Sequence, residues 1–295
     1  MSTTIEPIPQ TGPRADETRS LPEIGGIEIT GVDLSEALSQ DRRDWLLHTF
    51  RAHPVVVFRD QDLTKEQQYE FTLIFGEIEG LHVNRHIDAV KYTPVHTVSN
   101  IGSDGKPSAP TRERGNYYWH TDKSYHDVPS LLTMLHGVEI PSRGGETQFA
   151  NTAMAYASLD EATKQRLEGL RAIHSWERSR IQSRSMPATD EQKRERPPVD
   201  HPIVRTHPDT GAKALYLGNH ASHVLGMPEE EGHALVRWLE AFATQPGFVY
   251  SHRWQSGDLV MWDNRRTLHR ALPHVDMDKE RRVLHRTVVK GTVPY

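Results

Sequence analysis

The apolar positions of this chain predict both helices and strands, and the helical segments are described first. In residues 39–53, apolar side chains recur at the spacing of one helix face, with Ser39 as a candidate N-cap. Thr64 and Gln67 have the spacing of a capping box, which predicts that a helix follows. The predicted helices are 39–53, 64–76, a pair around 152–169, and 228–245.

Short β-branched and apolar runs predict strands in much of the remaining chain. The run PVVVFRD, residues 54–60, is typical of a buried strand. Asp209, Thr210 and Gly211 separate two apolar stretches, which favours a hairpin. Further strands are predicted at 26–34, 130–140, 144–151, 171–176, 248–254, 258–262 and 282–290. Since neither an internal repeat nor a βαβ alternation is evident, we predict a mainly antiparallel β core with flanking helices.

Two segments lack either period. Residues 1–22 are rich in Pro, Thr and Glu, and we expect them to form a flexible N-terminal arm. Residues 178–201 are polar and nearly aperiodic, so they form either a disordered loop or a mobile lid.

Composition narrows the class of protein. With 295 residues, 36% of them hydrophobic and 25% charged, the chain can bury a large core. Its net charge of −5 and the lack of a basic stripe argue against a general nucleic-acid binder. Its 18 histidines provide many candidate metal ligands, but they also multiply chance motifs.

The absence of cysteine excludes disulfides, thiolate metal sites and a cysteine nucleophile, and it is compatible with a reducing cytoplasm. The N-terminal residues do not show a basic start followed by an apolar stretch, so no secretory signal is expected. No apolar run approaches the roughly 18 residues that span a bilayer. We therefore expect a cytoplasmic protein without a membrane or nucleic-acid partner.

The pattern His-x-Asp occurs four times, beginning at His86, His120, His207 and His274. The copy at 207 lies in the predicted hairpin turn, and the copy at 274 precedes a charged loop. The copy at 86 lies in a polar stretch. Only the copy at 120 follows an aromatic, strand-like stretch, NYYW. Context therefore favours His120 and Asp122.

In a strand, residues i and i+2 point to the same face, so His120 and Asp122 can converge on one ion while Thr121 turns away. Two histidines and one carboxylate form the facial triad of non-haem iron(II) sites, which leaves positions for cosubstrate and oxygen. The best candidate for the second histidine is His269, in a polar turn after the apolar run 259–262. The alternative is that these are surface or capping residues.

Arg282 and Arg286 share one face of the strand predicted at 282–290, about 13 Å apart. If that face lines a barrel, two buried guanidinium groups require anions, and arginine holds carboxylates bidentately. If the strand lies at an exposed edge, both are ordinary surface arginines.

Several blocks in order resemble the iron(II)/2-oxoglutarate-dependent dioxygenases of the taurine and 2,4-dichlorophenoxyacetate dioxygenase family. The resemblance covers nearly the whole chain after the arm and rests on WHTD, PSRGGETQF, GDLVMWDNRRTLHR and RRVLHR. The blocks GNHASHVLG and FVYSHRWQSGDLVMWDNR are most similar to the aryloxyacetate-degrading branch. The loop from His269 to Arg282 is about two residues longer than in similar members.

The resemblance implies a single domain over 23–295 with a double-stranded β-helix, the cupin-like jelly roll. It implies Fe(II) ligands at three positions, a clamp for the far carboxylate of 2-oxoglutarate, and a site for the substrate acid. The matching residues are His120, Asp122 and His269 for iron, Thr147 and Arg282 for 2-oxoglutarate, Arg286 for the substrate acid, and Asn116 and His82 near the substrate pocket.

The implied reaction uses Fe(II), 2-oxoglutarate and O2 to hydroxylate a small acid. We expect an aryloxyacetate such as 2,4-dichlorophenoxyacetate, giving a phenol and glyoxylate with succinate and CO2. Asp122 favours hydroxylation, since related halogenases carry a small residue there. Alternatives are an alkyl- or arylsulfonate, a sulfate ester, a 2-aryloxypropionate, a non-catalytic iron- or acid-binding protein, or a zinc hydrolase. Family members are commonly homo-oligomers, which we also expect here.

Overall fold

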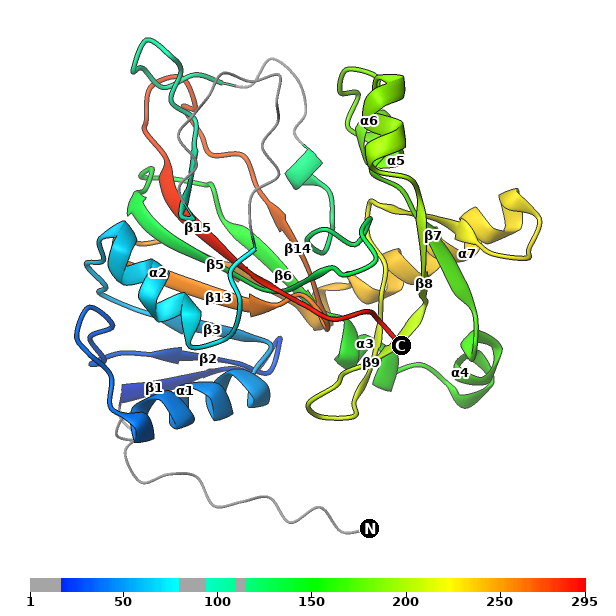
Figure 1. Ribbon diagram of the computed structural model, residues 1–295, viewed down its shortest axis with the longest axis horizontal. Helices are drawn as coiled ribbons and strands as arrows, with labels where there is room; N and C mark the ends of the chain where they lie inside the picture. The colour runs from blue at the N-terminus through cyan, green and yellow to red at the C-terminus, as the bar shows by residue number, and fades with distance from the viewer. Residues whose placement is uncertain (1–16, 80–93, 110–114) are drawn as a thin grey trace.

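Two β-sheets packed face to face form the centre of the molecule (Figure 1). The computed structural model describes residues 17–79, 94–109 and 115–295. In the larger sheet the strand order is β1-β2-β3-β13-β5-β15-β4, and in the smaller it is β12-β6-β14. The larger sheet comprises β1 Thr18–Leu21, β2 Gly26–Ile29, β3 Val55–Phe58, β4 His96–Ser99, β5 Ser130–Glu139, β13 Leu259–Asp263 and β15 Val283–Lys290. The smaller comprises β6 Thr147–Asn151, β12 Val249–His252 and β14 Thr267–Ala271.

The larger sheet is apolar on both faces, because its central strands are covered on both sides. In β3, Val55 and Val57 pack with Phe149 of the smaller sheet. Val56 and Phe58 point the other way, into a core that includes side chains of two helices, α1 Gln40–Ala52 and α2 Lys65–Leu73. Burial on both faces accounts for the continuous apolar run in this strand.

Helices α1 and α2 begin at the capping residues that the sequence predicts. Ser39 caps α1 by accepting a hydrogen bond from the backbone N–H of Arg42, and Thr64 and Gln67 form the expected capping box of α2. The expectation of no βαβ unit is wrong, however. Strands β2 and β3 pair in parallel, and α1 lies between them in the sequence. Pairing between strands separated by a helix is a long-range property that the short, four-residue β2 did not reveal.

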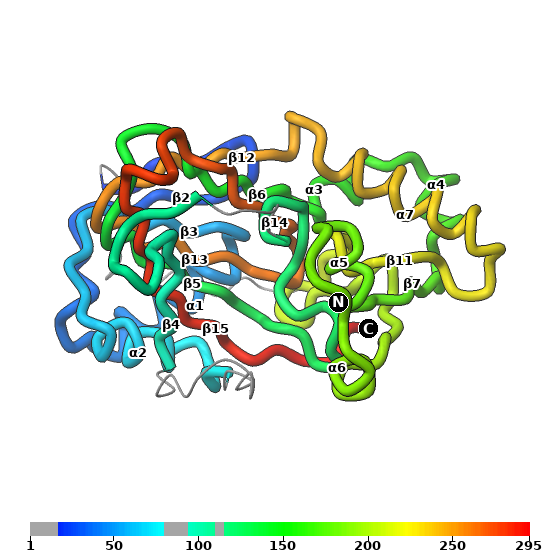
Figure 2. The backbone as a smooth tube through the Cα atoms, turned by 90° about the horizontal axis from the view of Figure 1, so that it is seen from above, coloured from blue at the N-terminus to red at the C-terminus, as the bar shows by residue number. Residues whose placement is uncertain are grey.

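A second group of elements extends the molecule away from α1 and α2 (Figures 1 and 2). The predicted hairpin around Gly211 is confirmed by the pairing of β9 with β10. Among the described residues, no helix is long and apolar enough to cross a membrane. The strands here are β7 Arg171–His174, β8 Val199–Pro202, β9 Val204–Thr206, β10 Lys213–Leu215 and β11 Ala221–Val224. The helices are α3 Thr152–Ala157, α4 Glu161–Leu167, α7 Glu229–Ala243 and the 3-10 turn η3 Pro246–Phe248.

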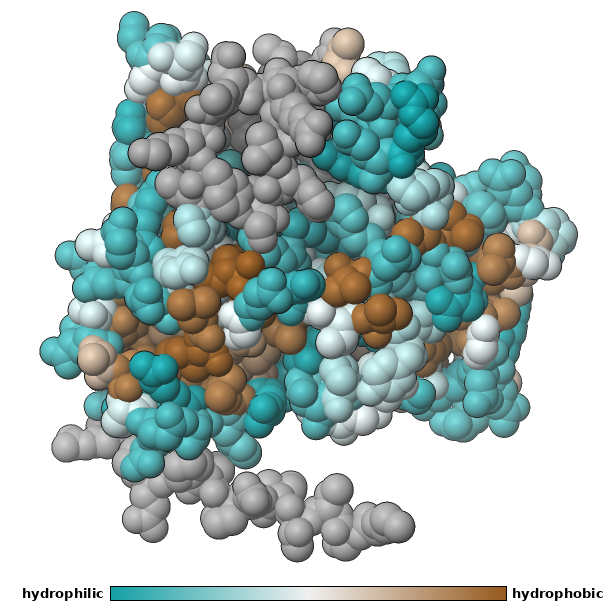
Figure 3. Space-filling view, viewed as in Figure 1, coloured by the Kyte–Doolittle hydropathy of each residue, from teal (hydrophilic) through white to brown (hydrophobic). Residues whose placement is uncertain are grey.

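The two segments without a period contain regular structure. The end of the expected 1–22 arm forms β1, because Thr18–Leu21 pairs with β2 and buries Leu21. The earlier residues 1–16 lie outside the described part. Within 178–201, α5 (Trp176–Gln182) ends, and α6 (Asp190–Glu195) begins at a capping box. Figure 3 shows that the surface around α5 and α6 is strongly hydrophilic, so local capping rather than apolar periodicity specifies these short helices.

Candidate active site

His120 and His269 are joined through their backbones at one end of the sandwich. His120 forms an isolated antiparallel bridge with His269 of β14, with N–H to carbonyl distances of 3.0 and 2.8 Å. Gly218 packs closely against this bridge, since a Cβ there would lie 2.9 Å from the Cα of His120, and its φ is +114°. The bridge brings two of the three predicted ligands together.

The predicted strand around His120 is wrong. The aromatic stretch includes a 3-10 turn, η2 Gly115–Tyr117, and a turn begins at Asp122. His120 and Asp122 therefore converge through a bridge and a turn, not through strand alternation. Thr121 does point away from the site, since its hydroxyl donates to the carbonyl of Asn264 at 2.7 Å.

The three candidate ligands are close enough to share one ion. His120, Asp122 and His269 each offer one ligand atom, and these atoms lie within 4.8 Å of one another. Nε2 of His269 is 3.8 Å from Oδ2 of Asp122. The two imidazole rings have centroids 4.1 Å apart. Two imidazoles and one carboxylate fit a first-row divalent metal.

Each histidine is held with one nitrogen directed at the site. Nδ1 of His120 donates to the carbonyl of Tyr118 at 2.8 Å, so its Nε2 is left to bind a metal. The ring of His269 lies 4.7 Å from that of Trp262 and 6.4 Å from that of Phe149. Burial lowers the pKa of both site histidines below the ordinary value. Both are thus favoured in the neutral form that binds metals.

Asp122 is held as a carboxylate. Burial alone would raise its pKa, but opposing interactions, of which the positive charge of Arg286 is the largest, lower the pKa far below the usual range. Nη2 of Arg286 lies 2.7 Å from Oδ1, and the hydroxyl of Thr133 donates to Oδ2 at 2.5 Å. The carboxylate is therefore charged and fixed in orientation.

Thr133 and Asn264 support the carboxylate, and sequence reasoning missed both. The side-chain amide of Asn264 donates to Oγ1 of Thr133 at 3.0 Å, and its Oδ1 accepts from Nε1 of Trp262 at 3.1 Å. The signal in the sequence was a threonine between two apolar residues, Leu132 and Met134, and the structure buries all three in β5. A buried polar side chain needs hydrogen-bond partners, and those of Thr133 are Asp122 and Asn264.

Arg282 and Thr147 both lie at the segment 145–147. Thr147 is buried in β6 opposite Ala271, two residues along from the pair Phe149–His269. Its Oγ1 accepts a hydrogen bond from Nε1 of Trp254 at 3.0 Å. Nη2 of Arg282 donates to the carbonyl of Gly145 at 3.2 Å.

Arg286 projects from β15, which lies between β5 and β4 and is not an edge strand. Its neighbour on the same face, Leu284, is fully buried between the sheets. Arg282 precedes the strand, and an irregularity between Val283 and Leu284 interrupts the alternation assumed for the two arginines. Arg286, with 29% of its side chain exposed, is accessible to a ligand beside Asp122.

The remaining sequence candidates have different positions. Asn116 lies in η2, and its Oδ1 is buried without a hydrogen-bond partner in the described residues. His82 and the copy at His86 lie outside the described residues. The copy at His207 is structural, since its Nε2 donates to buried Asp263 at 2.7 Å.

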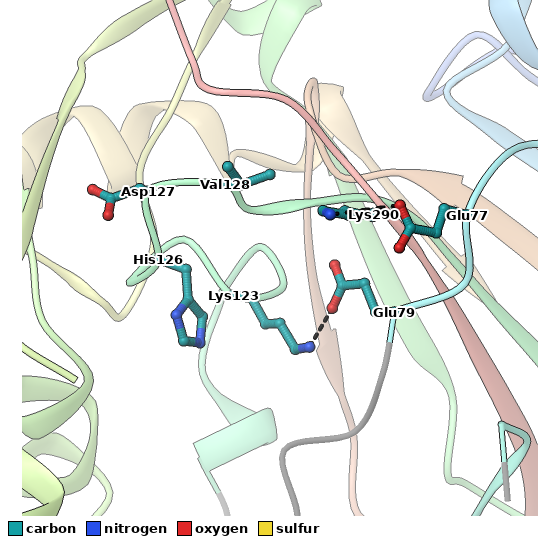
Figure 4. A pocket seen from close by; sticks show the side chains of 7 residues that line it. All are labelled: Glu77, Glu79, Lys123, His126, Asp127, Val128 and Lys290. Atoms are coloured by element: carbon teal, nitrogen blue, oxygen red, sulfur yellow. Dashed lines mark hydrogen bonds and ion pairs between the residues drawn. The ribbon is translucent and has the colours of Figure 1, made fainter. Parts of the chain in front are cut away.

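A charged pocket of about 350 Å³ lies next to Asp122 along the chain (Figure 4). Lys123 pairs with Glu79, and Lys290 pairs with Glu77 at 3.5 Å. Both lysines of this pocket therefore already face glutamates.

Comparisons with known proteins agree with this geometry. The family model described as "Taurine catabolism dioxygenase TauD, TfdA family" matches residues 17–288. The alpha-ketoglutarate-dependent 2,4-dichlorophenoxyacetate dioxygenase of Cupriavidus pinatubonensis is 37% identical over 272 residues, which cover 90% of this chain and 94% of the relative. The (S)-phenoxypropionate/alpha-ketoglutarate-dioxygenase of Sphingobium herbicidovorans is 34% identical, covering 88% and 90%.

The fold comparison points the same way. The crystal structure of AAD-2 in complex with Mn(II) and N-oxalylglycine superposes with a TM-score of 0.83 at 38% identity, covering 94% of this chain and 99% of that one. The predicted jelly roll is thereby confirmed. The family match over nearly the whole described chain confirms the resemblance seen in the sequence. The chain belongs to the TauD/TfdA family of dioxygenases.

Proposed function

We propose that this protein is an Fe(II)- and 2-oxoglutarate-dependent dioxygenase that hydroxylates a small organic acid, with an aryloxyacetate such as 2,4-dichlorophenoxyacetate as the substrate. The observation that carries the proposal is the convergence of His120, Asp122 and His269 within 4.8 Å, with Arg286 beside them. A facial set of two histidines and a carboxylate leaves room for cosubstrate and O2. The relatives named above support the substrate class.

The residues present fit an iron ion. Nε2 of His269 lies 3.8 Å from Oδ2 of Asp122, so both atoms can bind one ion, and burial, which lowers the pKa of His269, favours the neutral imidazole that binds metals. His120, Asp122 and His269 would hold Fe(II). Together with 2-oxoglutarate and O2, the iron supplies the oxidising chemistry that converts 2-oxoglutarate to succinate and CO2 while the substrate gains a hydroxyl group.

Arg282 and Thr147 would hold the far carboxylate of 2-oxoglutarate. Arginine binds a carboxylate bidentately, and a hydroxyl can donate a further hydrogen bond. The Thr147 hydroxyl oxygen already accepts from Trp254, so its own hydrogen is directed elsewhere and can be donated. This pair orients the cosubstrate.

Arg286 would receive the carboxylate of the substrate, and Asn116 and His82 would shape the pocket around its ring. With the carboxylate at Arg286, the carbon beside the ether oxygen is the one presented for hydroxylation. The resulting hemiacetal breaks down to a phenol and glyoxylate. Segment 178–201 is proposed as a lid, supported by its position next to η2, which carries Asn116.

The test measures phenol release from phenoxyacetate and 2,4-dichlorophenoxyacetate with Fe(II), 2-oxoglutarate and ascorbate, with succinate followed in parallel. Phenol equal to succinate is expected. Succinate without phenol would move the substrate to the alternatives, an alkyl- or arylsulfonate, a sulfate ester or a 2-aryloxypropionate. Neither product, with iron bound, would favour a non-catalytic binding protein.

A zinc hydrolase built on the same triad is tested by anaerobic absorption spectroscopy. Fe(II) and 2-oxoglutarate together should give a visible charge-transfer band in the dioxygenase. A hydrolase does not need the Arg282–Thr147 clamp, so its spectrum would not respond to 2-oxoglutarate.

Location and assembly are further parts of the proposal. We propose the cytoplasm as its location, with which the lack of cysteine is compatible. Homo-oligomer formation is supported by exposed apolar side chains around α7, where Leu225 is 52% and Trp238 48% exposed. Light scattering coupled to size-exclusion chromatography measures the mass, and a monomer would contradict this part.

A further inference from the structure

A second group of metal-ligating side chains lies where β11 ends and α7 begins. His223, Glu229 and His233 each offer one ligand atom, and these atoms lie within 4.8 Å of one another. In the described part of the chain, this is the one such group apart from the candidate iron site. His223 belongs to β11, while Glu229 and His233 stand one turn apart on α7. The three residues therefore connect a strand to a neighbouring helix (Figure 2).

One residue, Ser222, contacts both histidines. Its carbonyl accepts a hydrogen bond from Nδ1 of His233 at 2.7 Å, and its hydroxyl lies 3.1 Å from Nδ1 of His223. With both Nδ1 atoms engaged, Nε2 of each ring is left as the atom that can bind an ion. Metal-binding histidines are commonly oriented by such contacts from their second nitrogen.

The contact between His233 and Glu229 points to a cation. Because Nδ1 of His233 carries the hydrogen donated to Ser222, Nε2 of the neutral ring is an acceptor. That atom lies 3.3 Å from Oε1 of Glu229, which is also an acceptor. Two acceptors that face each other require a positive charge between them, either a proton on the imidazole or a metal ion.

The arrangement is held by close packing of the helix on the strand. A Cβ at Gly232 would lie 2.6 Å from the backbone nitrogen of Val224, so only glycine allows α7 to approach β11 this closely. This approach brings His233 to the carbonyl of Ser222. Both histidines are half-buried, whereas the Glu229 side chain is 75% exposed. An ion here would be held by the two histidines on the side of the protein and would be accessible to solvent on the side of Glu229.

We propose that His223, Glu229 and His233 form a second metal site that takes a divalent transition-metal ion such as Zn²⁺. Imidazole nitrogen suits Zn²⁺, Cu²⁺ and Ni²⁺, whereas Mg²⁺ and Ca²⁺ prefer sites made of oxygen ligands. The exposed side leaves positions for water. An ion bound here ties β11 to the first turns of α7, and it stabilises the folded chain by an amount that grows with the logarithm of its affinity.

The test titrates Zn²⁺ alone into the full chain by calorimetry. Two ions per chain are expected in the wild type, one at each site, and one ion is expected in the variant His120→Ala/His269→Ala. His233→Asn removes Nε2 while its amide can still donate to the carbonyl of Ser222. In either background it should weaken the second site, with Kd raised about tenfold or more. Zn²⁺ should raise the Tm of the double variant His120→Ala/His269→Ala. It should not raise the Tm when His233→Asn is added to that variant.

His48→Ala on α1 is the matched control, because it removes a histidine outside both groups and should leave both sites unchanged. The wild-type comparison keeps the test valid if the double variant fails to fold. One ion in the wild type, or Zn²⁺ binding that His233→Asn leaves unaltered in both backgrounds, would overturn the proposal. Equally tight binding of Mg²⁺ would also overturn it, since it would indicate unspecific attraction to surface carboxylates.

Discussion

The guanidinium group of Arg286 lies 2.7 Å from Oδ1 of Asp122, so the residue proposed to bind the substrate acid contacts a proposed iron ligand directly. A metal ion would bind the carboxylate of this ion pair, whereas the substrate acid would bind its guanidinium group. An acid bound at Arg286 would share the positive charge that otherwise faces Asp122. The affinity for substrate and the electrostatics of the metal site are thus coupled through one side chain.

Replacing Arg286 with Gln should raise the KM for phenoxyacetate by about 10- to 100-fold, because a charged bidentate contact to the carboxylate is lost. Succinate formation without substrate should persist, since Arg282 and Thr147 are intact. Parallel assays of phenol and succinate measure both effects. An unchanged KM would exclude Arg286 as the acid-binding residue.

Replacing Thr133 with Val should weaken Fe(II) binding by about 10- to 100-fold, because Asp122 loses the hydrogen bond that orients its carboxylate. Anaerobic equilibrium titration with Fe(II) provides the Kd. Thr133→Ser, which keeps the hydroxyl, is the control and should bind iron nearly as tightly as the wild type. If Val and Ser variants bind iron equally, the hydrogen bond has no role in metal binding.

Gly218→Ala should destabilise the fold by about 1–3 kcal/mol and weaken metal binding, since it combines left-handed backbone strain with a clash against His120. Urea unfolding and Fe(II) titration measure the two effects. Gly211→Ala is the matched control: its φ is +70°, but nothing lies within 4 Å of the added Cβ. It should share the strain without the metal defect. If both variants bind Fe(II) more weakly, the clash with His120 is not the cause of the weaker binding.

Acid should destabilise the protein through buried histidines such as His174. Burial holds the pKa of His174 well below its ordinary value of 6.5, so the unfolded chain binds the proton first as the pH falls. Stability is then lost below about pH 6.5, at up to about 1.4 kcal/mol per pH unit for this one group.

His174→Phe should reduce this pH dependence, because its ring can replace the imidazole stacked on Tyr216 and does not titrate. Urea unfolding near pH 7.5 and pH 5.5 measures the difference for both proteins. Equal losses of stability in the variant and the wild type would show that His174 does not contribute to acid sensitivity.

Local signals in the sequence account for much of the fold. The capping residues Ser39 and Thr64, the apolar run of β3 and the turn at Gly211 each act within a few residues, and the structure has them as expected. The parallel pairing of β2 with β3 and the inclusion of β1 in the sheet depend on contacts between distant segments, which local patterns do not encode.

The site was predictable in part for the same reason. His120, Asp122 and His269 stood out through motif and context, and the structure brings them together, although by a bridge and not by a strand. Thr133 in β5 and Asn264 in the turn after β13 act through a hydrogen bond between segments that are distant in the sequence. The sequence around Asn264 does not indicate its hydrogen bond with Thr133.

The backbone bridge between His120 and His269 bears on the thermodynamics of metal capture. Two hydrogen bonds hold these residues side by side independently of any ion. The conformational entropy of bringing the two imidazoles together is therefore lost when the chain folds, not when metal arrives. Metal uptake meets a pre-organised pair of ligands, so ion removal should leave the backbone of the jelly roll almost unchanged.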